Sequence, residues 1–111
     1  MWKDGLNYPE LTALGGGAYG VNYSGAGPTD DPMDFLMGHG THCASIIAAQ
    51  WNNGQGTAGV SSSARIMALD FLTGNSATSN AILCYRYLIT AKKAGVNVAA
   101  VNNSWGPGTY D

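Results

Sequence analysis

The chain has 111 residues, enough for one domain with a modest core. Hydrophobic residues make up 45% of the sequence, which argues against intrinsic disorder, and charged residues make up only 11%. The formal net charge is −2 and no basic cluster occurs, so we expect no nucleic-acid partner.

Residues 1–38 show little periodicity and are interrupted by glycine and proline, so we expect mostly loop, with a short extended piece over 21–23. A loop of this length is uncommon in a compact domain unless it is functional or separated from its context. Its aspartates, Asp30, Asp31 and Asp34, are expected to form a solvated acidic segment.

The first helix is expected over residues 41–50, with glycines 38 and 40 marking its entry. A turn-rich loop, WNNGQGT, follows over 51–57. The residues that recur at helical spacing are Ala44, Ile47 and Ala48.

A strand, a long helix and a second strand are expected next. Apolar runs predict buried strands over 64–69 and 96–101, and residues 78–94 predict the clearest helix. Lys92 and Lys93 complement the dipole at the end of this helix, and Gly95 caps it. The apolar stripe of the helix is expected to comprise Ala81, Ile82, Tyr85, Leu88 and Ile89.

This order is a βαβ unit, which predicts an α/β fold with a parallel sheet. Binding sites in such sheets gather beyond the carboxyl ends of the strands. Residues 71–76 and 102–106 follow the two expected strands, so we expect them at one functional edge. A nucleotide-binding βαβ unit is disfavoured, because no Gly-x-Gly-x-x-Gly turn joins strand and helix.

The two cysteines, Cys43 and Cys84, fall on different expected helices. They suit either a disulfide or two separate buried thiols, so the redox compartment stays open.

The sequence GHGTHCASIIAA at 38–49 resembles the histidine motif of the subtilisin-like serine proteases, the subtilase or peptidase S8 family. Further segments similar to that family follow in order at 59–60, 64–69 and 101–106. The resemblance covers nearly the whole chain. It implies that residues 1–111 form part of a three-layer domain, with a parallel central sheet and flanking helices.

The resemblance implies that His39 is the general base of a serine endopeptidase, since an imidazole titrates near neutral pH. His42 is expected to be a packed, hydrogen-bonded residue. Considered alone, His39 also suits a helix-cap histidine. We expect no metal at this pair, because zinc-protease helices place histidines four apart beside a glutamate, and here the spacing is three.

Two segments are expected to bind substrate. Ser104, Trp105 and Gly106 resemble the segment whose backbone forms one wall of the pocket for the side chain before the cleaved bond. Gly74 and Asn75 fall where the family's other substrate-aligning edge lies. The alternatives are a plain strand-to-turn transition with Trp105 as a core aromatic, and an ordinary turn before a helix.

A protease of this type also needs an aspartate and a serine. Asp4 is the only early candidate, and too few residues precede it to supply the strand that carries the family's aspartate. No Gly-Thr-Ser block occurs. We therefore expect the aspartate strand upstream, and the oxyanion asparagine and nucleophilic serine downstream, so that this chain alone is inactive. The rival function is a non-catalytic descendant that binds peptides.

No cofactor is expected for catalysis, and a structural calcium is compatible with the full-length protein. The loop at 51–57 lies where some relatives bind calcium, but it offers only neutral donors, so we expect an ordinary turn.

The expected partner is a protein or peptide substrate, and the oligomeric state is not indicated. The resemblance implies a secreted or cell-surface protein. The chain shows no signal peptide, and its apolar runs are too short for a membrane segment.

Overall fold

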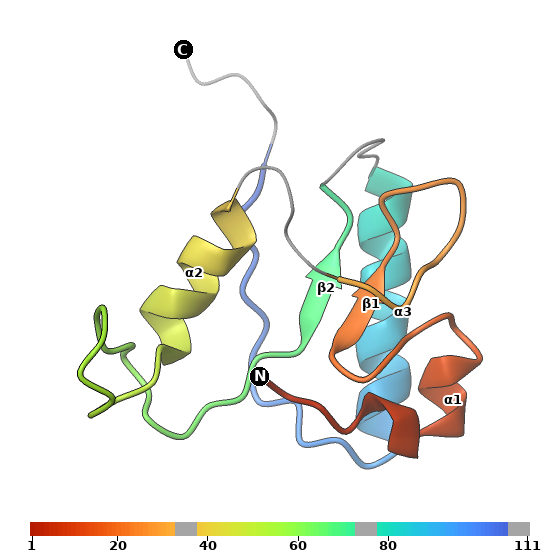
Figure 1. Ribbon diagram of the computed structural model, residues 1–111. Helices are drawn as coiled ribbons and strands as arrows, with labels where there is room; N and C mark the ends of the chain where they lie inside the picture. The colour runs from red at the N-terminus through yellow and green to blue at the C-terminus, as the bar shows by residue number, and fades with distance from the viewer. Residues whose placement is uncertain (33–37, 73–77, 107–111) are drawn as a thin grey trace.

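The computed structural model describes residues 1–32, 38–72 and 78–106. In Figure 1, α1, the two strands and α3 gather on one side, while α2 stands apart beyond β2. The elements in chain order are a 3₁₀ helix η1 (Gly5–Asn7), α1 (Pro9–Thr12), β1 (Gly20–Asn22), α2 (His39–Ala48), β2 (Ala68–Asp70) and α3 (Thr78–Lys93).

The two strands form a parallel sheet in which Gly20 pairs with Ala68 and Asn22 with Asp70. The helix α2 lies in the connection between them, so the observed βαβ unit is β1–α2–β2, which is compatible with the predicted α/β class. Gly20 has φ +145°, and a Cβ there would overlap the carbonyl oxygen of Ala68. Only glycine therefore fits this strand entry without strain.

The N-terminal region holds more structure than expected. The extended piece is confirmed as β1, but η1 and α1 occupy a region predicted to be loop. Pro9 sits in the first turn of α1, where its fixed φ suits a helix and its missing N–H is not needed. Both helices are too short to show a periodic pattern, which is why periodicity misses them.

The long helix α3 confirms the predicted range and its glycine cap. Gly95 adopts φ +102°, and its N–H donates to the Lys92 carbonyl at 3.2 Å. The N–H of Val96 donates to the Ala91 carbonyl at 3.0 Å. These two hydrogen bonds form a Schellman motif, which satisfies carbonyls at the end of the helix.

The predicted apolar stripe of α3 is wrong in most of its members. Ile82 is 57% exposed and Ile89 is 54% exposed, while the buried face runs through Ala81, Cys84, Tyr87 and Ala91. This face turns its small residues toward the sheet and α1, because they let the helix approach closely. Tyr87 is the large residue on this face; it is fully buried, with its hydroxyl close to Gly16.

The second predicted strand, over residues 96–101, is not formed. Val96 and Val98 are half-buried, but their N–H groups bond to the Ala91 carbonyl and to the Val96 carbonyl. Lys92 Nζ in turn donates to the carbonyl of Val98 at 3.0 Å. These groups are thus satisfied within the chain turn that follows α3, and no neighbouring strand pairs with the segment among the described residues.

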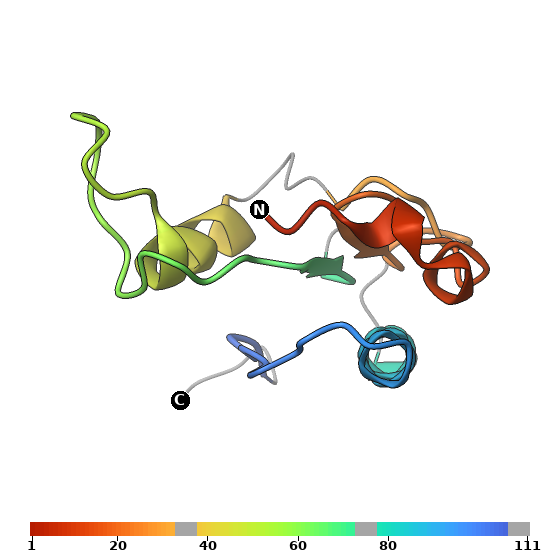
Figure 2. The same ribbon diagram turned by 90° about the horizontal axis from the view of Figure 1, so that it is seen from below.

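The hydrophobic core lies between the sheet, α1 and α3, and Figure 2 shows α3 covering one side of the strands. The segment that follows α3 lies on that same side, whereas α2 lies level with the sheet. Within the described residues, no helix is long and apolar enough to cross a membrane. The buried hydrophobic residues are Trp2, Leu11, Val21, Tyr23, Phe71, Ala81, Cys84, Tyr87 and Ala91.

Candidate active site

His39 is the first residue of α2, so the helix begins two residues earlier than predicted. Gly38 precedes it as the N-cap in a left-handed conformation, with φ +66°. The Gly38 carbonyl accepts the N–H of His42 at 2.9 Å, which closes the first turn. Glycine adopts this conformation without the steric cost of a Cβ, so the chain can turn sharply and present His39 at the helix entrance.

The imidazole of His39 is exposed and contacts a thiol of its own helix. Its Nε2 lies 3.8 Å from Sγ of Cys43, one turn further along α2. Within the described part of the chain, no carboxylate or hydroxyl hydrogen-bonds to the ring. The residue thus has the access that a general base needs, but the described residues supply neither an orienting carboxylate nor a nucleophile.

His42 differs from its expected role. It was expected to be packed and hydrogen-bonded, yet it is exposed. The reason is that α2 buries none of its residues, since no helix or strand in the described part of the chain packs closely over it. Among the described residues, no group of three or more histidine, cysteine or acidic side chains is placed to hold a metal ion.

The two segments expected at one edge of the sheet do meet. Phe71 directly follows β2 and is buried, and its ring stands edge-on to Trp105, with ring centroids 5.1 Å apart. Trp105 is 41% exposed, so it covers Phe71 without being a core residue itself. Ser104 accepts a hydrogen bond from Asn102 Nδ2 at 2.8 Å, and Gly106 is exposed.

Asn103 organises this segment, although no individual role is predicted for it from the sequence. Its Oδ1 accepts the Tyr85 hydroxyl at 2.9 Å and the Trp105 indole N–H at 3.3 Å. The side-chain oxygen therefore ties the segment to α3 and fixes the indole over Phe71. The only available sequence signal is its place at the end of an expected strand, which does not specify these partners.

The structure does not join the two parts of the predicted site. No hydrogen bond or ring contact links His39 to Ser104, Trp105 or Gly106 among the described residues. In Figure 2, α2 lies level with the sheet and the segment after α3 lies to one side of it. Gly74 and Asn75, the other expected substrate contacts, lie outside the described residues, as does Asp34.

Asp4 has a partner other than a histidine. Its Oδ2 lies 3.3 Å from Nη1 of Arg65, in an ion pair whose two side chains are largely exposed. Such a pair contributes about 0–1 kcal/mol. Asp4 is therefore a surface residue beside the start of the chain, and it does not orient His39.

The loop at 51–57 is a sequence of bends, as predicted. The Asn53 side-chain oxygen accepts the N–H of Gln55 at 3.0 Å, and the Trp51 indole donates to the Gly59 carbonyl at 2.7 Å. The loop contains no carboxylate, and of its three amide side chains Asn53 accepts a backbone N–H within the loop.

Of the two arrangements open to the cysteines, the structure shows free thiols. Cys84 is buried in the core and Cys43 is half-buried on α2. Burial raises the pKa of Cys84 to about 11, and the nearby Asp70 carboxylate adds to that rise. The Cys84 thiol therefore acts as a small apolar core group at neutral pH.

Together these features define an α/β chain that presents an exposed histidine at the first position of a helix, behind a left-handed glycine. We compared the sequence of the chain with models of known protein families. The model of the subtilase (peptidase S8) family matches residues 12–111, and the chain belongs to that family.

A curated relative matches a shorter stretch. Over 45 residues the chain is 51% identical to a protein described as "Thermophilic serine proteinase" from Bacillus sp. (strain AK1). This match covers 40% of the chain and 11% of the relative, so the chain corresponds to a small part of that protein. No solved structure matches the chain.

Proposed function

We propose that this chain supplies the histidine-bearing part of a serine endopeptidase, and that His39 is its general base and then its general acid. The match to the subtilase family over residues 12–111 carries the proposal, because it spans the histidine helix and the segment at 102–106 together. The exposed ring at the helix entrance supports it, since a base must reach the hydroxyl that it deprotonates.

The substrate is a protein or peptide, bound in extended form along the segment Ser104–Gly106. The contact between Trp105 and Phe71 supports this role, because it anchors the segment at the end of β2 and leaves its backbone exposed. An extended peptide can pair with main-chain groups presented in this way. Gly74 and Asn75 form the opposing edge in this proposal. A secreted or cell-surface location follows from the family.

The aspartate and the serine of the triad come from outside this sequence. Two observations support this: Asp4 pairs with Arg65, and no Gly-Thr-Ser block occurs in the 111 residues. Loss of a triad member lowers the rate by orders of magnitude. The 111-residue chain by itself therefore hydrolyses no peptide. The proposed chemistry requires no cofactor, and a structural calcium is compatible with the full-length protein.

A fluorophosphonate probe tests the proposal on the polypeptide that contains this chain together with the aspartate and serine segments. We expect labelling of one serine. We also expect His39→Ala to lower kcat on the order of 10⁴-fold or more, while the exposed His42→Ala keeps most of the activity. A correctly folded full-length protein that is not labelled would support the rival peptide-binding function. Turnover by the 111-residue chain that is lost in His39→Ala would contradict its proposed incompleteness.

A further inference from the structure

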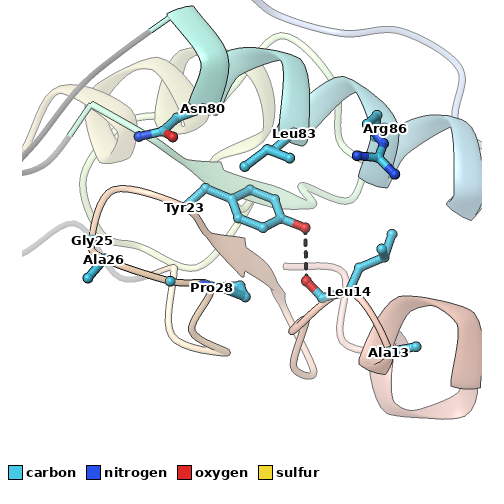
Figure 3. Close-up of a pocket in the computed structure, with 10 residues that line it drawn as sticks. Ala13, Leu14, Tyr23, Gly25, Ala26, Pro28, Asn80, Leu83 and Arg86 are labelled. Atoms are coloured by element: carbon cyan, nitrogen blue, oxygen red, sulfur yellow. Dashed lines mark hydrogen bonds between the residues drawn. The ribbon is translucent and has the colours of Figure 1, made fainter.

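A pocket opens on the side of the molecule that carries the core, away from the candidate active site. It lies between the turn after α1, the loop after β1 and one side of α3, as Figure 3 shows. Its volume is about 340 Å³, at the lower end of the range for small-molecule sites. Neither His39 nor the segment Ser104–Gly106 lines it.

The walls of this pocket are mostly apolar. Leu14 contributes from the turn after α1, Pro28 from the loop after β1 and Leu83 from α3. The ring of Tyr23 lies among them, and its hydroxyl donates to the Leu14 carbonyl at 2.9 Å. Because that donor is already used, Tyr23 offers a ligand chiefly its aromatic surface.

Arg86 is the one charged side chain among the described residues that line the pocket. Figure 3 shows it reaching from α3 on the same side as Leu83, toward Tyr23. Burial raises the pKa of Tyr23 and the Arg86 charge lowers it in part, which agrees with a guanidinium close to the hydroxyl. No carboxylate in the described residues forms an ion pair with Arg86, because the one described salt bridge joins Arg65 and Asp4.

We propose that this pocket binds a small carboxylic acid with a hydrocarbon body, its carboxylate on Arg86 and its body against Leu14, Leu83 and Tyr23. A guanidinium matches a carboxylate with two parallel hydrogen bonds, which a compact ammonium group cannot do. A single cation and apolar walls favour one carboxylate over a phosphorylated ligand, whose higher charge needs more donors. This site does not depend on the proposed peptidase function, because the two share no residue.

Titration of the isotope-labelled 111-residue chain with sodium octanoate, followed by two-dimensional amide NMR, tests the proposal. We expect saturable shifts at the amides of Gly25, Leu83 and Arg86, and no comparable shifts in α2. Arg86→Met should weaken octanoate binding at least ten-fold, whereas Arg86→Lys should weaken it less. The uncharged analogue 1-octanol should bind at least ten-fold more weakly than octanoate.

Arg65→Met is the matched control, because Arg65 is also an exposed arginine but lies outside the pocket. It should leave octanoate binding unchanged. The absence of saturable binding to the folded chain would overturn the proposal. Equal binding of octanol, or equal binding by Arg86→Met with an unchanged circular dichroism spectrum, would overturn the role of Arg86.

Discussion

The two sides of this molecule are built differently. The packed side is built from α1, β1, β2, α3 and the residues next to them, and among the described residues it contains the buried hydrophobic side chains between Leu11 and Ala91. The open side consists of α2 and the loop that follows it, and α2 buries no residue. His39, the proposed general base, lies on the open side.

The open side is held mainly by backbone hydrogen bonds. The N–H groups of Gly59, Val60 and Ser61 donate to carbonyls of Ala49, Ile46 and Ile47 at 2.9–3.0 Å. These bonds fix the returning chain against the helix, but they do not fix the helix against the sheet. A helix can therefore be specified by its own sequence, while its position depends on side-chain packing that the described residues do not provide. The position of the His39 side chain relative to the sheet is therefore less firmly determined than the positions of the core side chains.

Truncation of one buried and one exposed aliphatic side chain gives the largest contrast between the two sides. Leu11 is fully buried, so Leu11→Ala should lower the free energy of unfolding by about 2–5 kcal/mol. Ile46 on α2 is 56% exposed, so Ile46→Ala should change it by less than about 0.5 kcal/mol. Urea denaturation of both variants measures the difference. Equal losses would mean that α2 is packed as firmly as the core.

Two Gly→Ala substitutions, one on each side of the molecule, compare how tightly the backbone is packed on the two sides. Gly20→Ala places a Cβ on the Ala68 carbonyl at φ +145°, and should cost about 2–3 kcal/mol and disturb strand pairing. Gly54 has φ +69° but open space around it, so Gly54→Ala should cost only about 1 kcal/mol. The two Tm values, measured by circular dichroism, test this order. A Gly20→Ala variant as stable as Gly54→Ala would show that β1 does not pair with β2 as described.

These contrasts also explain what the sequence can predict. The two long helices were found because their signals are local: Gly38 opens α2, and Gly95 with the preceding lysines ends α3. The family segments placed His39 on a helix entrance for the same reason. Phe71 and Trp105 were correctly expected to lie close together, although the reason given was wrong, because residues 96–101 form no strand beside β2.

The failures concern features that depend on distant partners. Residues 96–101 have strand composition but form no strand, since a strand needs a neighbour and no described segment supplies one. The apolar stripe of α3 fails because Ile82 and Ile89 satisfy a helical period without being the face that meets the sheet. The role of Asn103 was missed because its partner Tyr85 lies 18 residues away. The local sequence pattern predicts that a helix or strand is present, whereas tertiary contacts determine which of its faces is buried.

Alkaline pH should weaken the packed side through its buried acids. Burial raises the pKa of Cys84 from 9.0 to about 11, so the unfolded chain loses this proton at lower pH than the folded chain. Stability is therefore fully present below pH 9.0 and falls as the pH rises toward about 11. Urea denaturation at a series of pH values measures the decline. Cys84→Ala should flatten it, whereas Cys43→Ala, a substitution on the open side, should not. The same decline in both variants would contradict the role of Cys84.

The smallest expected effect comes from two Tyr→Phe substitutions on the packed side, which separate the contribution of apolar packing from that of hydrogen bonding. The Tyr87 hydroxyl is buried and has no hydrogen-bond partner among the described residues, so Tyr87→Phe should be neutral or stabilise the chain by up to about 1 kcal/mol. Tyr23→Phe removes a hydroxyl that donates to Leu14, and should cost about 1 kcal/mol. Urea denaturation of the two variants compares the same chemical change in opposite settings. If Tyr87→Phe lowers the free energy of unfolding as much as Tyr23→Phe does, the Tyr87 hydroxyl has a hydrogen-bond partner in solution. Hydrogen bonding would then stabilise the core in addition to its apolar packing.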